Sequence, residues 1–216
     1  MEKPVIVFDL GKVLVDFDYS IAISRIANRS SRSPTEVEQF FFHSPLLLDY
    51  ESGRLTRREF FDQARQAISF RGTMEEFGNF FADIFTEIPP MIELHAELRQ
   101  RGFKTYIFSN TNDLAVEHIR RNFRFLGDFD GYIYSYEAGA MKPEAKMYEA
   151  LELLARRRRS KIIYLDDRPE NVAGGLARGW RTFLHETPEK TRAVLESYLQ
   201  SGGQSSASRQ KTARTE

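Results

Sequence analysis

The chain has 216 residues, the length of one large domain or of a core that carries one modest insertion. Its 31 Lys and Arg residues balance its 31 Asp and Glu residues, so no net charge attracts nucleic acid or an acidic membrane surface. The absence of cysteine excludes disulfides, thiolate zinc sites and cysteine nucleophiles. We find no membrane-spanning run and no signal peptide, so we expect a cytoplasmic protein without nucleic-acid or membrane partners.

Short apolar runs predict the strands of a buried sheet. The first run, Pro4 to Phe8, is rich in β-branched residues and ends at Asp9, which is typical of a strand covered on both faces. Similar runs follow at 104–108, 161–165 and 181–184, with a weaker one at 132–134. Helical patterns over 91–101, before Gly102, and over 144–158 lie between them. The alternation predicts an α/β fold with a mostly parallel sheet and helices on both faces.

The segment 18–86 interrupts this alternation, because it contains no convincing strand and three helix-start signals. Each signal is a capping box, with a hydroxyl residue at the N-cap and Glu three residues later. The pairs are Ser33 and Glu36, Thr56 and Glu59, and Thr73 and Glu76. Phenylalanines between residues 40 and 85 provide enough aromatic area for a small helical core. We therefore expect a helical cap, 18–86, inserted into a core formed by 1–17 and 87–199, followed by a disordered polar tail, 200–216.

Polar side chains follow the predicted strands at their carboxyl ends, where open α/β sheets bind ligands. In chain order these residues are Asp9, Gly11, Ser109, Asn110, Lys142, Asp166 and Asp167. Three carboxylates within a few Å would repel one another, so a cation must lie among them. Lys142 supplies one positive charge, and a divalent ion would supply the other two. Oxygen ligands without His or Cys suit a hard ion such as Mg²⁺ and an anionic, oxygen-rich substrate.

The motifs FDLGKVL, SNT, KP and YLDD stand in this order at the predicted strand ends and resemble the four motifs of the haloacid dehalogenase-like hydrolase superfamily. The resemblance covers roughly residues 5–185 and implies a Rossmann-like core with an inserted cap of the C1 type, which closes over the site. It also implies a Mg²⁺-dependent phosphatase that hydrolyses a small phosphorylated metabolite, for instance a sugar phosphate, through an aspartyl-phosphate.

The resemblance assigns roles to the acidic residues and the lysine. Asp9 would be the nucleophile, and its second oxygen, the Gly11 carbonyl and Asp166 would bind Mg²⁺. Asp167 would steady the water shell of the metal or Lys142. Lys142 itself would balance the charge of the nucleophile and the phosphate.

The remaining site residues would hold the substrate. The Ser109 side chain and the Asn110 backbone N–H would bind the transferring phosphoryl oxygens. Asn171 would touch the site from the face of a helix rather than act as a direct ligand. In the cap, Glu51 and Arg54 lie in a loop before a capping box, and we expect them to contact the substrate and set specificity.

Gly11 departs from most phosphatases of the superfamily, which carry a second Asp here that protonates the leaving group and then activates water. Positioned acid–base groups contribute about 10²- to 10⁴-fold. Three explanations stay open: a substrate with a good leaving group, such as an anomeric sugar phosphate or an acyl phosphate; another acid, such as Asp16; or a poor catalyst. A subgroup with the motif DLGNV, which includes α-D-glucose-1-phosphate phosphatase, has the same glycine, and FDLGKVLVDFD is most similar to it.

Other functions compete with the phosphatase. A 2-haloacid dehalogenase would use the same nucleophile without a metal, but it would need a halide-binding Arg near the first motif, where Lys12 stands. A phosphomutase would depend on the Asp that Gly11 replaces. A catalytically weak binding module would keep the fold and the metal site to sense a phosphorylated ligand or partner, and Gly11 is its one support. The sequence predicts no oligomeric state.

Overall fold

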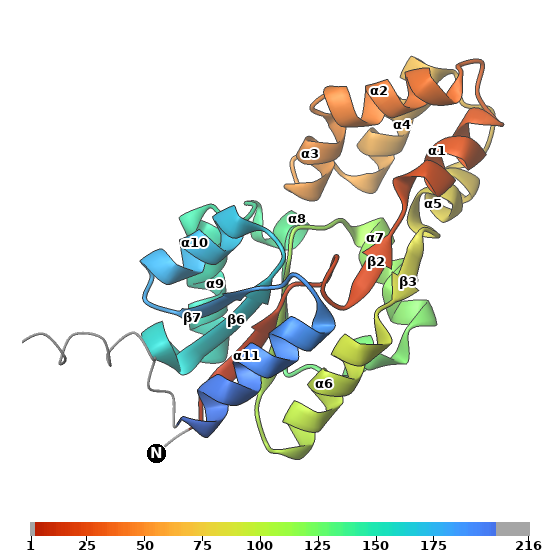
Figure 1. Cartoon of the computed structure of the whole chain (residues 1–216). Helices are drawn as coiled ribbons and strands as arrows, with labels where there is room; N and C mark the ends of the chain where they lie inside the picture. Colours follow the sequence, from red (N-terminus) through yellow and green to blue (C-terminus); the bar gives the residue numbers. More distant parts are fainter. Residues whose placement is uncertain (1–2, 202–216) are drawn as a thin grey trace, which may run out of the picture.

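The computed structural model describes residues 3–201, and its core is a five-stranded parallel sheet flanked by helices (Figure 1). The strand order is β5-β4-β1-β6-β7, and each neighbouring pair is parallel. The strands are β1 (Val5–Phe8), β4 (Thr105–Ser109), β5 (Gly131–Tyr134), β6 (Ile162–Asp166) and β7 (Arg181–Leu184). Each bound lies within one residue of its prediction, so the predicted α/β fold, Rossmann-like and mostly parallel, is confirmed.

The central strand, β1, is buried on both faces because both of its faces are apolar. Ile6 and Phe8 belong to the apolar cluster on one face, and Val5 and Val7 to the cluster on the other. The first cluster is covered by α6 (Pro89–Gln100), α7 (Asp113–Asn122) and α11 (Pro188–Gln200). The second is covered by α9 (Ala145–Ala155) and α10 (Pro169–Ala177). The short elements α8 (Ser135–Ala138), η1 (Arg124–Asp128) and η2 (Arg159–Lys161) connect these layers.

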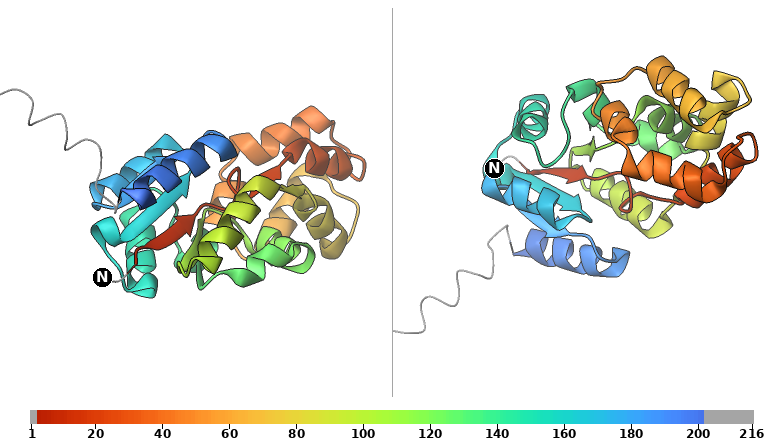
Figure 2. Two further views of the ribbon diagram at one scale, coloured as in Figure 1. Left: turned by 60° about the horizontal axis from the view of Figure 1, so that its bottom comes forward. Right: turned by 90° about the horizontal axis from the view of Figure 1, so that it is seen from above.

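Five helices form a separate bundle beside the core, as Figures 1 and 2 show from three sides. They are α1 (Tyr19–Ala27), α2 (Pro34–His43), α3 (Leu46–Glu51), α4 (Arg57–Ile68) and α5 (Met74–Ala82). The three predicted capping boxes are confirmed at the starts of α2, α4 and α5. The bundle has its own apolar cluster, in which the Phe77 ring packs against those of Phe60 and Phe81. All five helices lie within 18–86, and we keep these limits as a proposal for the cap.

Two short strands join the bundle to the core. They are β2 (Val15–Phe17) and β3 (Phe85–Glu87), and they pair antiparallel, with Phe17 opposite Phe85 and the two ring centroids 6.1 Å apart. The prediction that 18–86 contains no strand is therefore wrong at residues 85–86. A three-residue strand is too short to show the alternation by which strands are recognised.

The helix ends differ from the predictions by a few residues. Helix α6 ends at Gln100, and Gly102 has a φ of +78°, the left-handed conformation expected just after a helix. Helix α9 ends earlier than predicted, because Arg156 already adopts a left-handed conformation. Helix α11 includes Gln200, and residues 202–216 of the predicted tail lie outside the described residues. Among the helices of residues 3–201, none has the length and apolarity needed to cross a bilayer.

Candidate active site

A cavity of about 270 Å³ lies at the carboxyl ends of β1, β4 and β6, between the core and the helical bundle. Eight of the predicted site residues line it: Asp9, Gly11, Glu51, Ser109, Asn110, Lys142, Asp167 and Asn171. The structure thus brings together residues from five separate parts of the chain. Asp166 and Arg54 are the two predicted site residues that do not line the cavity.

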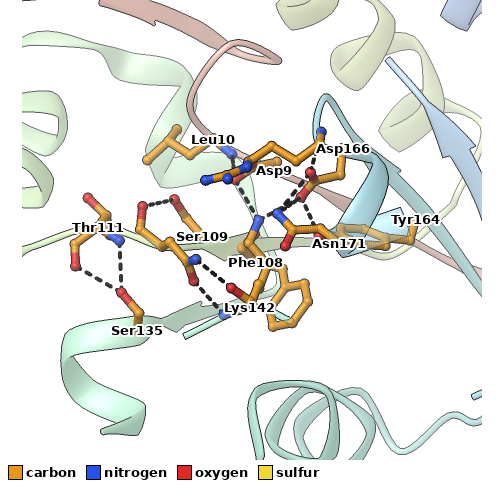
Figure 3. Close-up of polar contacts among 12 residues, drawn as sticks. Asp9, Leu10, Phe108, Ser109, Thr111, Ser135, Lys142, Tyr164, Asp166 and Asn171 are labelled. Carbon is orange, nitrogen blue, oxygen red and sulfur yellow. Dashed lines mark hydrogen bonds and ion pairs between the residues drawn. The ribbon is translucent and has the colours of Figure 1, made fainter. Parts of the chain in front are cut away.

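Lys142 is the centre of the charged group beneath this cavity (Figure 3). Its Nζ lies 3.0 Å from Oδ1 of Asp9 and 2.7 Å from Oδ2 of Asp166, and it donates to the carbonyl of Phe108 at 2.8 Å. The Leu10 N–H donates to Oδ1 of Asp9 as well, at 2.7 Å. Lys142 and the Leu10 N–H therefore both contact Oδ1 of the Asp9 carboxylate rather than Oδ2.

Burial and mutual attraction set the charges of this group. Burial raises the pKa of Asp9 to about 7; Lys142 opposes the rise, and Asp166 adds to it. Burial also opposes the ionisation of Asp166, but Lys142 and the Tyr164 hydroxyl hold the pKa of that carboxyl below its usual range. For Lys142 the two carboxylates outweigh burial and raise its pKa. Lys142 and Asp166 are therefore a buried ion pair, and Asp9 is the carboxylate whose charged form is less strongly stabilised.

The neighbouring residues Asp166 and Asp167 lie in different surroundings. Asp166 is fully buried, and its oxygens accept hydrogen bonds from the Tyr164 hydroxyl, the Arg168 N–H at 2.8 Å and Nδ2 of Asn171 at 3.0 Å. Asp167 lines the cavity, and burial together with Asp166 raises its pKa. One oxygen from each of Asp9, Asp166 and Asp167 lies within 4.8 Å of the others.

The loop after β4 forms the opposite wall of the cavity. Asn110 fixes Lys142 from both sides, since its Nδ2 donates to the Lys142 carbonyl at 3.0 Å and its Oδ1 accepts from the Lys142 N–H at 2.8 Å. Ser109 is buried and lines the cavity. Thr111, the last residue of the SNT motif, and Asn112 line it too, although neither was predicted to be a site residue. Asn112 is the N-cap of α7 and accepts from the Ala115 N–H, a capping signal that could have drawn attention to it.

The bundle contributes Glu51, at the end of α3, whereas Arg54 points elsewhere. Arg54 is exposed and pairs with Asp49 at 2.7 Å. The expectation that Arg54 contacts the substrate therefore finds no support in its position, because a nearer acidic partner on the same segment holds it at the surface. Phe17, Tyr19 and several aliphatic and aromatic side chains also line the cavity, and none of them was predicted to be a site residue.

The loop after β1 leaves little room for a side chain at position 11. A Cβ on Gly11 would lie 3.0 Å from the Phe17 ring. Asp16, the substitute acid considered above, does not line the cavity; it is half-exposed and ion-paired with Lys12. The hydrogen bond from Lys12 holds the pKa of Asp16 below its usual range, so this carboxyl carries no proton to donate near neutral pH.

Comparison with known proteins identifies the family. The haloacid dehalogenase-like hydrolase family matches residues 3–179, and the chain belongs to it, as its motifs predict. Over 203 residues the chain is 25% identical to D-ribitol-5-phosphate phosphatase from Bacteroides thetaiotaomicron. This alignment covers 91% of this chain and 98% of the relative. Over 113 residues it is 27% identical to haloacetate dehalogenase H-2 from Moraxella sp., which covers 47% of this chain and 50% of the relative.

Solved structures share the fold. A HAD family enzyme from B. thetaiotaomicron, in complex with magnesium and inorganic phosphate, has a TM-score of 0.77 at 22% sequence identity. The superposition covers 86% of this chain and 95% of the chain of that enzyme. L-2-haloacid dehalogenase from Xanthobacter autotrophicus has a TM-score of 0.59 at 17% sequence identity. The superposition covers 84% of this chain and 76% of the dehalogenase chain. At 22% and 17% sequence identity, the similarity to these structures shows a shared fold and nothing about activity.

Proposed function

We propose that the chain is a Mg²⁺-dependent phosphatase that hydrolyses a small phosphorylated metabolite through an aspartyl-phosphate on Asp9. The observation that carries this proposal is that Asp9, Lys142 and the Ser109–Asn110 loop line one cavity. A carboxylate nucleophile, a cation and polar groups for phosphoryl oxygens are what this reaction needs. Family membership and the similarity to a phosphatase over 91% of the chain support the same function.

The donors in the cavity fit a magnesium ion. Three carboxylate oxygens lie close together against one ammonium group, and an oxygen-only donor set suits a hard divalent cation. We assign the ion to Asp9, the Gly11 carbonyl and Asp167, because Asp167 lines the cavity while the oxygens of Asp166 already accept several hydrogen bonds. The roles that the motifs suggested for Asp166 and Asp167 are thus exchanged. When bound, Mg²⁺ supplies charge neutralisation for the phosphoryl oxygens.

The protein groups divide the chemistry among them. Asp9 attacks phosphorus and forms the aspartyl-phosphate, which water then hydrolyses. Lys142 balances the negative charge of nucleophile and substrate from below, in a buried site where a fixed charge acts strongly. Ser109 and the Asn110 N–H bind the phosphoryl oxygens. Asp166 and Asn171 act indirectly, because Asp166 holds Lys142 and Asn171 holds Asp166.

The cavity favours a small polar substrate such as a sugar or polyol phosphate. About 270 Å³ is at the small end of ligand pockets. Polar Glu51 and Asn112 next to aromatic Tyr19 suit hydroxyl groups on a short carbon chain. The relative named D-ribitol-5-phosphate phosphatase supports a polyol phosphate, and the DLGNV resemblance supports α-D-glucose 1-phosphate.

Phosphate release from a panel of sugar, polyol and acyl phosphates tests the proposal. We expect release that EDTA abolishes, that Mg²⁺ restores and that Asp9→Asn abolishes. Asp62→Asn is the matched control, because Asp62 lies on the surface of the bundle and pairs with Arg58. Turnover in Asp9→Asn equal to that of the wild type would reject the phosphatase. Tight phosphate binding with turnover no higher than in Asp9→Asn would favour the binding module.

A further inference from the structure

Three carboxyl groups within residues 3–201 line the cavity, and they come from two regions of the molecule. Asp9 and Asp167 belong to the core and lie together at the edge of the sheet. Glu51 belongs to α3 of the bundle and lines the same cavity from that part of the molecule. The leaving group of an in-line transfer lies opposite the attacking Asp9 oxygen, so the carboxyl group that the bundle contributes is the candidate to meet it.

Glu51 is held in place by contacts between its segment and the core. The preceding residue, Tyr50, is buried and donates its hydroxyl to Asp113 at the start of α7. The carbonyl of Glu51 accepts a hydrogen bond from Oγ of Ser135 at 2.6 Å. The following turn approaches the core so closely that a Cβ on Gly53 would lie 2.2 Å from the Tyr136 carbonyl oxygen. The Glu51 backbone is therefore anchored at the edge of the cavity.

The surroundings of Glu51 suit a group that exchanges protons near neutral pH. Burial raises the pKa of Glu51 to about 7, against the opposing effects of a hydrogen bond with Asn112 and the charge of Arg168. Tyr19, whose phenol also interacts with Glu51, is a far weaker acid, since burial and Glu51 raise its pKa. Catalytic acids and bases work best when their pKa lies near the working pH.

We propose that Glu51 is the general acid and base of the reaction. It would be the catalytic residue that performs the proton transfers for which most relatives use an Asp at the position of Gly11. This inference rests on the proposed phosphatase function. In the first step, Asp9 attacks phosphorus, the bond from phosphorus to the leaving oxygen breaks, and the Glu51 proton passes to that oxygen. In the second step, the Glu51 carboxylate takes a proton from water as the water oxygen attacks phosphorus. The bond to Asp9 then breaks, phosphate leaves, and both side chains return to their starting forms.

The isosteric variant Glu51→Gln separates this role from a binding role when two kinds of substrate are compared. An alkyl phosphate needs a proton on its leaving group, and we expect its kcat to fall by about 10²-fold or more while KM changes little. p-Nitrophenyl phosphate needs none, so the variant should release a burst of about one equivalent of nitrophenolate per site and then turn over slowly, because hydrolysis of the phosphoenzyme lacks its base. Asp49→Asn is the matched control, since Asp49 lies two residues earlier on α3 and outside the cavity.

Each alternative result identifies what has failed. If the wild type releases phosphate and Glu51→Gln keeps full activity toward the alkyl phosphate, Glu51 is not the acid. A rise in KM alone, or equal losses on both substrates without a burst, would reduce Glu51 to a binding residue. If Asp16→Asn, and not Glu51→Gln, selectively loses activity toward the alkyl phosphate, Asp16 is the acid. A wild type that releases no phosphate from any compound contradicts the phosphatase function itself, and the Glu51 inference with it.

Discussion

The core and the helical bundle differ in what they bury. Thirteen polar residues are buried within residues 3–201, and Ser52 is the one that belongs to the bundle. The core surrounds Lys142, Asp166 and Asp9 with two apolar layers, whereas the bundle packs phenylalanine rings against one another. The core thus fixes charged groups in one arrangement, at the cost of desolvating them. The bundle is stabilised by packing, and the residues on its inner surface can differ without disturbing the charges below.

Replacement of the buried lysine is expected to have the largest effect. Lys142→Met leaves Asp9 and Asp166 without their cation, and we expect it to lower the free energy of unfolding by about 3–5 kcal/mol and to abolish turnover. Urea denaturation and phosphate release measure both effects. Lys146→Met is the control, because Lys146 is exposed and should change stability by less than about 0.5 kcal/mol. Equal losses in the two variants would contradict the importance of the buried pair.

The aromatic cluster gives the corresponding test for the bundle. Phe77 is 1% exposed and contacts five other phenylalanine rings, so Phe77→Ala should cost about 3 kcal/mol or more through the cavity it leaves. Phe42→Ala, at a ring that is 44% exposed, should cost less than about 1 kcal/mol. Thermal and urea unfolding measure the difference. A small loss in Phe77→Ala would mean that packing does not hold the bundle together.

The junction between the two regions is tested at Gly53. Its φ of +72° and the nearby Tyr136 carbonyl leave no room for a side chain, so Gly53→Ala should cost about 1–3 kcal/mol and lower kcat by moving Glu51. Gly127→Ala is the matched control, because a Cβ there meets no atom within 4 Å. Urea unfolding and steady-state kinetics distinguish the two. Unchanged stability and kcat in Gly53→Ala would show that the contact does not position the bundle.

Buried His95 in the core should contribute to the pH dependence of stability. Burial lowers the pKa of His95 to about 4, below its unfolded value of 6.5, so the unfolded chain binds a proton more readily in this range. The contribution of neutral His95 is present above pH 6.5 and is lost as the pH falls toward 4. The raised pKa values of Asp9 and Glu51 act in the opposite direction over this range, so the His95 contribution is measured as a difference. Between pH 7 and pH 5.5 the wild type should lose about 1 kcal/mol of stability relative to His95→Phe. Identical slopes of unfolding free energy against pH in both proteins would contradict this.

Much of the fold could be predicted because its signals are local. Continuous apolar runs predict β1, β4 and β6, and the capping boxes predict three helix starts. Contacts between distant residues left no such signal: Tyr50 meets Asp113 across 63 positions, and β3 exists only because Phe85 pairs with Phe17.

The candidate site was predictable to the level of strand ends but not of side-chain directions. Asp166 is the last residue of β6 and is buried under the cavity, whereas Asp167 follows the strand and lines the cavity. Which of the two faces the cavity depends on the register of β6. For Arg54, the competing partner Asp49 decides the direction.

The most direct test of the central claim is to trap the phosphoryl group on the protein. The wild type is quenched in acid during turnover of p-nitrophenyl phosphate with Mg²⁺, and its peptides are mapped by mass spectrometry. We expect phosphate on Asp9, labile to hydroxylamine, and none in Asp9→Asn. Phosphate on another residue, or continued turnover in Asp9→Asn, would contradict the account.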